Sequence, residues 1–354
     1  MGDCGIEMTT QISKTVIIPT RNEEEYIEDC INSLLEGSNV INSTEFIIVD
    51  GKSSDRTLDI VREKFQHLNL KILNNSNVFQ ASALNLGIEN SSSNILEVGS
   101  DSQIIIRADA HSVYPENYLA LCVEALQKNL EVGNAGSIQK AVGKNYFSKA
   151  IALVMNSTLG MGGVKYRKIG NEKLESDTAY LGCWWKADLL KLGGFNEDFQ
   201  INEDYELNIR IRKFLNNNSI TINPNLIVDY FVRTNFLGLL KQFFRYGLWK
   251  TKTLSIHPDS LKKRQLAPVL FVLFLVSLII GNLILSYPYL EILNWIGAIV
   301  GLFWLIMIID IWKDSPKIIN VFLIPIVVLS MHISWGLGFL YGLLRWTRGG
   351  WNRS

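Results

Sequence analysis

The chain has 354 residues, 48% of them hydrophobic, and this length suits two structural units better than one small domain. Lys and Arg together number 34, as do Asp and Glu, so the formal net charge is zero and no nucleic-acid partner is expected. The four cysteines show no C-x-x-C spacing, which argues against a disulfide framework or a zinc site and favours a reducing compartment. The first fifteen residues contain no apolar stretch, so we expect no cleavable signal peptide.

The first part of the chain alternates short apolar runs with segments of helical periodicity. Four strands are predicted, at residues 15–20, 45–50, 70–73 and 104–106. Asn22 is the expected N-cap of the first helix, residues 80–88 are predicted to be helical, and the Ser- and Asn-rich residues 90–102 to form a loop. This alternation predicts an α/β fold with a mostly parallel sheet and helices on both faces.

The pattern is less regular beyond residue 111. Helices are predicted at residues 118–128 and 203–214, and strands at residues 132–142 and 220–230. Residues 144–174 are rich in Gly and Lys without clear periodicity, and we predict a mobile flap there. Residues 236–249 combine aromatic and basic side chains, as an amphipathic helix at a membrane surface does.

The last part of the chain contains three long apolar segments. They predict transmembrane helices at residues 268–286, 292–310 and 318–344. Each segment is about long enough to cross a hydrocarbon core of about 30 Å, and three in succession disfavour buried helices of a soluble protein. We therefore expect a multi-pass protein of the cell membrane.

Basic residues predict which side each end of these segments faces. They lie before the first segment, between the second and third, and after the third: Lys262, Lys263 and Arg264; Lys313 and Lys317; Arg345, Arg348 and Arg353. The first two groups mark the cytoplasmic side, but a third full span would place the last group outside, against the positive-inside rule. Three spans are expected, with a re-entrant segment or a break near Ser330 as alternatives.

Asp109 and His111 directly follow the buried strand at 104–106. In open α/β sheets, ligands bind beyond the carboxyl ends of the strands. An Asp-x-His pair at that place suits a divalent metal that holds an anionic ligand. The alternative is a strand followed by an ordinary polar turn.

Six short motifs occur in one order along the chain. They are Val16-Ile-Ile-Pro-Thr-Arg-Asn-Glu23, Ile48-Val-Asp-Gly-Lys-Ser-Ser-Asp55, Ala108-Asp-Ala-His111, Gly193-Gly-Phe195, Asn202-Glu-Asp204 and Gln242-Phe-Phe-Arg-Tyr246. Together they resemble the motif series of family 2 glycosyltransferases with the GT-A fold, and most of all that of the succinoglycan-type exopolysaccharide enzymes. The resemblance implies a catalytic domain at residues 13–250. The apolar segments add a juxtamembrane linker at 251–266 and a transmembrane region at 267–345.

The resemblance also implies a donor site for a nucleotide-diphosphate sugar. Its expected residues are Pro19, Thr20, Glu23, Asp50 and Asp109. Asp109 and His111 would hold Mg²⁺ or Mn²⁺ beside the diphosphate. The family carries a second Asp where this chain has His111, so the metal preference stays open. Leu84 stands where many relatives place an Arg near the diphosphate, and Asp50 could instead cap the following helix.

The general base is expected at the start of the helix after Asn202. Asp204, rather than Glu203, would take the proton from the acceptor hydroxyl in a single displacement with inversion. The alternative is that both carboxylates only favour the helix dipole. Gly193 and Gly194 are expected beside the acceptor, where they allow close backbone approach.

Gln242, Arg245 and Tyr246 resemble the Gln-x-x-Arg-Trp motif of processive membrane synthases, with Tyr at the Trp position. The alternative is a plain interface helix. The expected function is transfer of a sugar to a lipid-linked, polyprenyl-type acceptor by a membrane enzyme that also contacts membrane lipids and has a cytoplasmic catalytic domain. The competing hypotheses are a processive polysaccharide synthase and a non-enzymatic transport or scaffold protein with a nucleotide-sensing domain.

Overall fold

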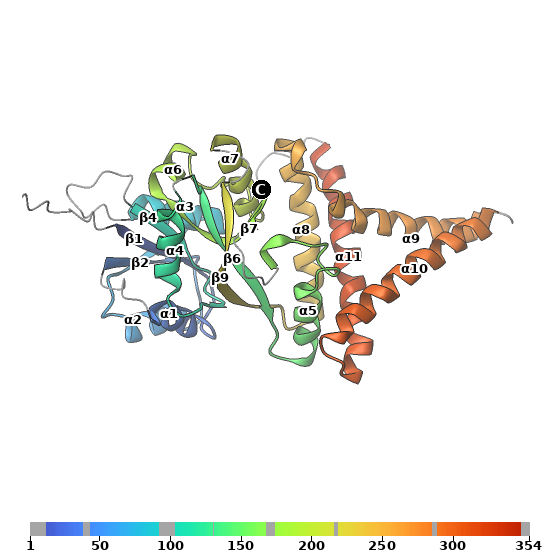
Figure 1. The fold of residues 1–354 in the computed structure, drawn as a ribbon, viewed down its shortest axis with the longest axis horizontal. Helices are drawn as coiled ribbons and strands as arrows, with labels where there is room; N and C mark the ends of the chain where they lie inside the picture. Colours follow the sequence, from blue (N-terminus) through green and yellow to red (C-terminus); the bar gives the residue numbers. More distant parts are fainter. Residues whose placement is uncertain are drawn as a thin grey trace, which may run out of the picture. The chain divides into compact units, whose positions relative to one another are not determined.

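A computed structural model describes most of the chain, and its residues group into two compact units (Figure 1). The described residues are 12–37, 43–91, 103–129, 131–167, 174–215, 219–284 and 289–347. Unit 1 comprises residues 1–138 and 170–228, and unit 2 comprises residues 139–169 and 229–354. The division into 13–250, 251–266 and 267–345 stays a prediction.

Four parallel strands form one half of the sheet in unit 1. They are β1 (Ser13–Thr20), β2 (Thr44–Asp50), β3 (Leu70–Asn74) and β4 (Gln103–Arg107), in the order β3-β2-β1-β4. Their β-branched side chains supply the core, and Ile17, Ile47 and Ile106 are fully buried. Thr20 pairs with Asp50 and Asp50 with Asn74, so the carboxyl ends of these strands meet at one edge. All four predicted strands are confirmed.

Three helices follow β1, β2 and β3: α1 (Ile27–Leu35), α2 (Thr57–Lys64) and α3 (Gln80–Asn90). The prediction that Asn22 caps the first helix is wrong, because α1 begins five residues later. Asn22 has a left-handed backbone (φ 55°) and its side chain accepts a hydrogen bond from the Ser54 amide at 2.8 Å. This contact ties the loop after β1 to the loop after β2. Of the predicted loop at 90–102, residues 92–102 lie outside the described residues.

The other half of the sheet is antiparallel where it joins β4. The remaining strands are β5 (Ser112–Val113), β6 (Asn134–Val142), β7 (Leu174–Glu175), β8 (Tyr180–Trp185) and β9 (Ile220–Phe231). β8 pairs antiparallel with both β4 and β6. The helices of this part are α4 (Tyr118–Gln127), α6 (Lys186–Lys191) and α7 (Glu203–Phe214). The result is a mixed nine-stranded sheet in an α/β fold.

The predicted flap at 144–174 is wrong for residues 146–156, which form a helix. In unit 2, α5 (Tyr146–Asn156) occupies this region, followed by a short 3₁₀ turn at Lys165–Arg167. A capping box starts the helix: the Asn145 side chain accepts from the Ser148 amide at 2.7 Å, and the Asn145 amide donates to the Ser148 hydroxyl at 2.8 Å. In the sequence, the glycines and lysines around Asn145 and Ser148 hid this capping pattern. Residues 168–173 lie outside the described residues.

The remaining helices of unit 2 are long: α8 (Phe236–Ile256), α9 (Leu266–Ile284), α10 (Tyr289–Lys313) and α11 (Ile318–Thr347). The last three are long and apolar enough to cross a membrane. α8 extends to Ile256, so the first part of the predicted linker is helical. α11 is continuous through Ser330, where a break had been an alternative.

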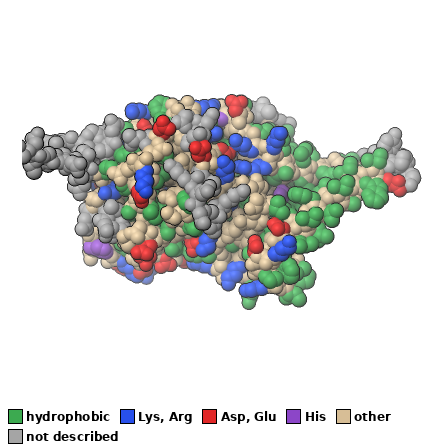
Figure 2. Space-filling model, in the orientation of Figure 1, with side chains coloured by type: hydrophobic (Ala, Val, Ile, Leu, Met, Phe, Trp, Pro, Cys, Tyr) green, Lys and Arg blue, Asp and Glu red, His purple; other side chains and the backbone are tan. Residues whose placement is uncertain are grey.

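α8 and α11 pack side by side along much of their length (Figure 1). Glycines allow this approach: a Cβ atom at Gly247 would collide with the Trp335 carbonyl, and one at Gly338 with the Phe244 carbonyl. The ring of Phe244 also contacts that of Tyr341, with centroids 5.9 Å apart. In contrast, α9 and α10 run away from α11 and converge, and the side chains exposed along them are mostly apolar (Figures 1 and 2).

Candidate active site

A pocket of about 170 Å³ opens at the carboxyl ends of β1, β2 and β4. Its lining includes five of the predicted donor and metal residues: Pro19, Thr20, Glu23, Asp109 and His111. Gly51, Asn75, Val78, Phe79 and Gln80 also line it. The pocket therefore lies where parallel strands expose their ends, as open α/β sheets place their ligands.

Asp50 does not line this pocket, although its neighbours Val49 and Gly51 do. Its carboxylate accepts hydrogen bonds from the Ser53 amide at 3.1 and 3.3 Å and so orders the turn after β2. Asp55 accepts from the Thr57 amide at 3.0 Å and thereby supports the start of α2. Both carboxylates shape the loop that borders the pocket.

Asp109 is held from one side. Its Oδ1 atom accepts hydrogen bonds from Gln80 Nε2 and Arg107 Nε, each at 3.1 Å. Its backbone amide donates to the Tyr114 hydroxyl at 2.7 Å. No hydrogen bond reaches Oδ2 from the part of the chain that the structure describes, so this oxygen is available to a ligand in the pocket.

His111 lies 3.1 Å from Glu23, measured from Nδ1 to Oε1. Both side chains are partly buried, and they join the loop after β4 to the loop after β1. The pair gives His111 an acidic neighbour that an ordinary polar turn would lack.

Arg107 links Asp109 to the start of α7. The guanidinium is buried (5% exposed), and its Nη1 lies 3.3 Å from Glu203 Oε1, while its Nε bonds Asp109. Burial disfavours its charge, but the charges of Asp109, Glu203 and Asp204 outweigh this and raise the Arg107 pKa overall. A cation thus sits between the expected metal ligand and Glu203, the neighbour of the expected base Asp204.

The two carboxylates at the start of α7 differ in environment. Burial first, and then the charge of Asp204, raise the pKa of Glu203 to about 7, although Arg107 opposes this. Burial also raises the pKa of Asp204, which Arg107 again opposes. Asp204 is the more accessible of the two, and its Oδ1 accepts from the Tyr205 amide at 2.6 Å. Asn202 precedes them with a left-handed backbone (φ 67°) and makes no side-chain cap.

The Gly193-Gly194 loop is held from two helices. Asn85 of α3 exchanges two hydrogen bonds of 2.8 Å with the backbone of Phe195. Arg210 of α7 donates to the Gly194 carbonyl at 2.8 Å. Both glycines have left-handed backbones, with φ of 79° and 70°. The loop is thus fixed to the helix that carries Asp204.

Gln242, Arg245 and Tyr246 belong to unit 2, on α8. The Gln242 amide donates to the hydroxyls of Tyr246 at 2.8 Å and Tyr230 at 3.1 Å, and Arg245 is exposed. Burial raises the pKa of Tyr246, so its hydroxyl stays protonated. The structure brings Gln242 and Tyr246 together, and their role toward an acceptor stays a prediction.

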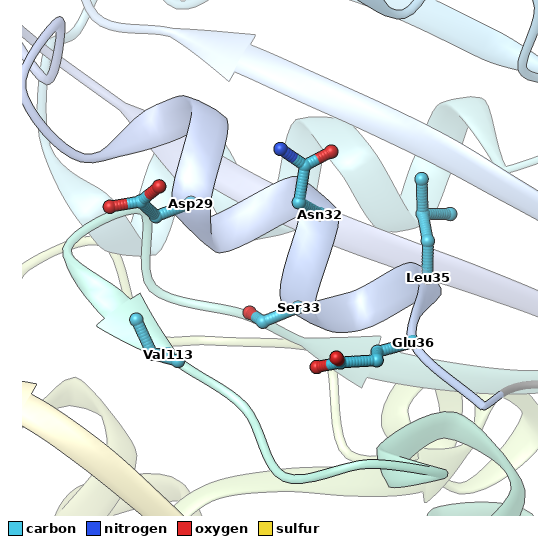
Figure 3. Close-up of a pocket in the computed structure, with 6 residues that line it drawn as sticks. All are labelled: Asp29, Asn32, Ser33, Leu35, Glu36 and Val113. Atoms are coloured by element: carbon cyan, nitrogen blue, oxygen red, sulfur yellow. The ribbon is translucent and has the colours of Figure 1, made fainter.

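A second hollow, of about 500 Å³, lies elsewhere in unit 1 (Figure 3). It is lined by side chains of α1 and its end, and by Val113 of β5: Asp29, Asn32, Ser33, Leu35, Glu36 and Val113. None of the residues predicted for the site lies here. Although larger, this hollow lacks the convergent strand ends and polar network of the first pocket, which we take as the active site.

Sequence reasoning missed three residues of this network. Arg107, Gln80 and Val78 were not assigned to the site. Val78 lines the pocket with a left-handed backbone (φ 66°), which is rare for a β-branched residue and is found where a site requires it. Arg107 had one detectable signal, a charge at the last position of a fully buried strand.

Comparisons with known proteins show what the chain is similar to. Residues 15–181 match the model of the glycosyl transferase family 2. The chain is 28% identical to the succinoglycan biosynthesis protein ExoA of Rhizobium meliloti, over 96% of this chain and 97% of that protein. It is 29% identical to the dolichyl N-acetyl-alpha-D-glucosaminyl phosphate 3-beta-D-2,3-diacetamido-2,3-dideoxy-beta-D-glucuronosyltransferase of Methanococcus voltae, over 94% and 97%.

Among solved structures, a mannosyltransferase from Pyrobaculum calidifontis in complex with GDP-Man and Mn²⁺ is similar in fold. The TM-score is 0.64 at 18% identity, over 95% of this chain and 88% of that one. The predicted GT-A fold followed by apolar helices is thereby confirmed.

Proposed function

We propose that this chain is a family 2 glycosyltransferase, because residues 15–181 match that family model, and that it moves a sugar from a nucleotide-diphosphate donor to a lipid-linked acceptor with inversion. The observation that carries the proposal is the line of side chains from the pocket through Asp109 and Arg107 to Glu203 and Asp204. It connects a place for the donor to a place for a base.

The donor would occupy the pocket at the strand ends. The first residues of α3 line this pocket, so the positive end of the helix faces the place of the diphosphate. Leu84 is buried (1% exposed) and cannot contact the donor, which leaves this role to the helix end and to a metal. The bound GDP-Man of the Pyrobaculum mannosyltransferase supports a nucleotide-sugar donor.

The residues present fit a divalent metal that is shared with the donor. Within the described residues, no three His, Cys, Asp or Glu side chains cluster as a complete metal site. Asp109 offers Oδ2 to the pocket, and Mg²⁺ is commonly held by one or two carboxylates together with substrate phosphates and water. Asp109, with His111 as the second candidate, would hold Mg²⁺ or Mn²⁺. Such an ion neutralises charge on the leaving diphosphate.

Asp204 would accept the proton of the attacking hydroxyl. It is more accessible than Glu203, whose carboxylate is engaged by Arg107. The Gly193-Gly194 loop, tied to α7 by Arg210, would form the acceptor side. The names of two relatives, one a succinoglycan biosynthesis protein and one a dolichyl-phosphate glycosyltransferase, favour a polyprenyl-linked acceptor at the membrane. The basic residues directly before α9 favour a catalytic domain in the cytoplasm.

The test separates the donor site from the base. Asp204→Asn should keep donor affinity and lower single-turnover transfer by roughly 10²–10⁴-fold, the usual contribution of a general base. Asp109→Asn should weaken donor binding as well as transfer. Calorimetry with nucleotide sugars and Mn²⁺, beside transfer rates, would measure both. Loss of donor binding in Asp204→Asn, or normal transfer in Asp109→Asn, would contradict these roles. Product length distinguishes single transfer from a processive synthase.

A further inference from the structure

The three apolar helices of unit 2 are covered by protein to different degrees. In the most apolar stretch of each helix, 17% of the residues are buried in α9, 6% in α10 and 39% in α11. On α9 the buried Val269 and Val272 lie near its start, and on α10 the buried Met307 and Ile311 lie near its end. The opposite ends are exposed, with Leu283 at 80% and Trp295 at 71%. These two helices therefore touch the rest of unit 2 at one end only (Figure 1).

α11 is packed in a different way. Its C-terminal part lies on α8, with Gly338 against the Phe244 carbonyl and Gly342 against Thr251. The opposite face of the helix is apolar and exposed along its whole length. This stripe consists of Ile318, Phe322, Ile326, Leu329, Leu337 and Leu344. One face buried against protein and one continuous apolar face suit a helix that contacts lipid along one side.

The position of α8 follows from its charges. It carries Lys241, Arg245, Lys250 and Lys252 and no acidic residue, which does not suit the hydrocarbon core. Lys250 donates to the Ser260 carbonyl at 2.9 Å and so fixes the end of α8 to the segment that leads into Lys262–Arg264. Those basic residues stand directly before α9 and mark the cytoplasmic side. α8 therefore lies on the cytoplasmic side.

The contact with α8 leaves α11 too little length to cross. After α10 returns the chain to Lys313 and Lys317 on the cytoplasmic side, only residues 318–334 precede the part packed on α8. Seventeen helical residues extend about 25 Å, less than a hydrocarbon core of about 30 Å. A crossing α11 would also carry its α8-packed part to the far side, away from the cytoplasmic α8.

We propose that α9 and α10 alone cross the bilayer, as a hairpin, and that α11 lies along its cytoplasmic surface. The stripe on α11 then contacts the lipid acyl chains, and its other face packs on α8. This arrangement differs from the three predicted spans and removes their conflict, because Arg345, Arg348 and Arg353 come to the cytoplasmic side with all other basic groups. It does not depend on the proposed function.

Cysteine labelling tests the two ends. In full-length chains that carry Cys4→Ser, with Cys30, Cys122 and Cys183 buried, Ser286→Cys and Ser354→Cys are each treated with a membrane-impermeant maleimide in intact cells. Ser286→Cys should react in intact cells, and Ser354→Cys only after permeabilisation. The chain with Cys4→Ser alone is the background control. Reaction at Ser354→Cys in intact cells, or none at Ser286→Cys, would overturn the proposal.

Spin labels test the orientation of α11. Nitroxides placed singly at Phe322, Leu329, Leu337 and Leu344, with the protein in phosphatidylcholine–phosphatidylglycerol nanodiscs, should report similar oxygen accessibility at all four positions. The control set on α9, at Leu270, Leu273 and Ile280, should instead show a gradient with depth. A maximum at Leu329 and Leu337 with a fall toward both ends would show that α11 crosses.

Discussion

Arg107 connects two parts of the site that are far apart in sequence. Its planar guanidinium bonds Asp109 through Nε and Glu203 through Nη1, and 96 residues separate Arg107 from Glu203. The rigid, planar guanidinium of an arginine holds two carboxylates at a fixed separation. The ammonium group of a lysine, on its flexible side chain, cannot do so. The position of Glu203 relative to the donor site, and with it that of the neighbouring base Asp204, thus depends on Arg107.

Arg107→Lys keeps the charge but removes the planar guanidinium, so we expect turnover to fall roughly 10²-fold through misplacement of the base. Donor affinity should change much less, because Gln80 still holds Asp109. Single-turnover transfer rates and donor calorimetry measure the two effects. Arg56→Lys, at an exposed ion pair, is the control and should change neither. Equal activity of both variants would exclude a positioning role for Arg107.

The raised pKa of Glu203 predicts that the stability of the folded chain depends on pH. Burial and Asp204 raise its pKa to about 7, from a usual 4.5, so between these values the folded chain holds a proton that the unfolded chain has released. The stability contribution of this group therefore falls as pH rises through that window. Glu203→Gln cannot titrate, and its Tm should decline less than that of the wild type between pH 5 and 7.5. The exposed Glu63→Gln should keep the wild-type slope; a wild-type slope in Glu203→Gln would refute the raised pKa.

The site residues that follow strands could be predicted from the sequence, and those that depend on distant contacts could not. Pro19, Thr20 and Asp109 stand where apolar runs end, and parallel pairing brings such ends together. Gln80 and Arg107 owe their place to hydrogen bonds between elements, for which local periodicity carries no signal. Glu203 was expected in the pair that supplies the base, with Asp204 preferred, but its ion pair with Arg107 was invisible in the sequence.

At the level of elements, glycines set the contact between α8 and α11. A side chain at Gly338 would meet the Phe244 backbone, which cannot move aside as a flexible side chain can. Gly338→Leu should therefore separate the helices and lower the Tm of the detergent-solubilised protein by about 5 °C or more. Gly301→Leu is the matched control, because a Cβ at Gly301 on α10 meets nothing within 4 Å. A similar Tm in the two variants would show that this contact does not stabilise the fold.

The elements themselves were predictable where periodicity was strong. The four parallel strands and the three long apolar helices follow from local patterns and were found. α5 was missed because its capping residues, Asn145 and Ser148, are embedded in a Gly- and Lys-rich segment. The antiparallel position of β8 beside β4 was not anticipated either, because strand order depends on packing between segments about 75 residues apart.

For the whole molecule, the two units divide the expected tasks. Every residue that lines the donor pocket lies in unit 1, as do Arg107, Glu203 and Asp204. The helices that meet the membrane, and Gln242 with its two tyrosine partners, lie in unit 2. Donor binding and delivery to a membrane acceptor should therefore be separable by truncation.

A chain that ends at Lys263 lacks α9, α10 and α11. We expect it to bind nucleotide sugar with nearly unchanged affinity, since the pocket in unit 1 is intact, but to lose transfer to the lipid-linked acceptor. It should still need detergent, because removal of α11 uncovers Gly247 and the apolar side chains around it on α8.

A chain in which only residues 273–306 are replaced by a short polar linker keeps α11 and is the matched comparison. It should stay soluble with less detergent if α11 covers α8 as described. Full-rate transfer to the native acceptor by the chain that ends at Lys263 would show that the apolar helices serve only as an anchor. Loss of donor binding in that chain would show that unit 1 depends on these helices to fold.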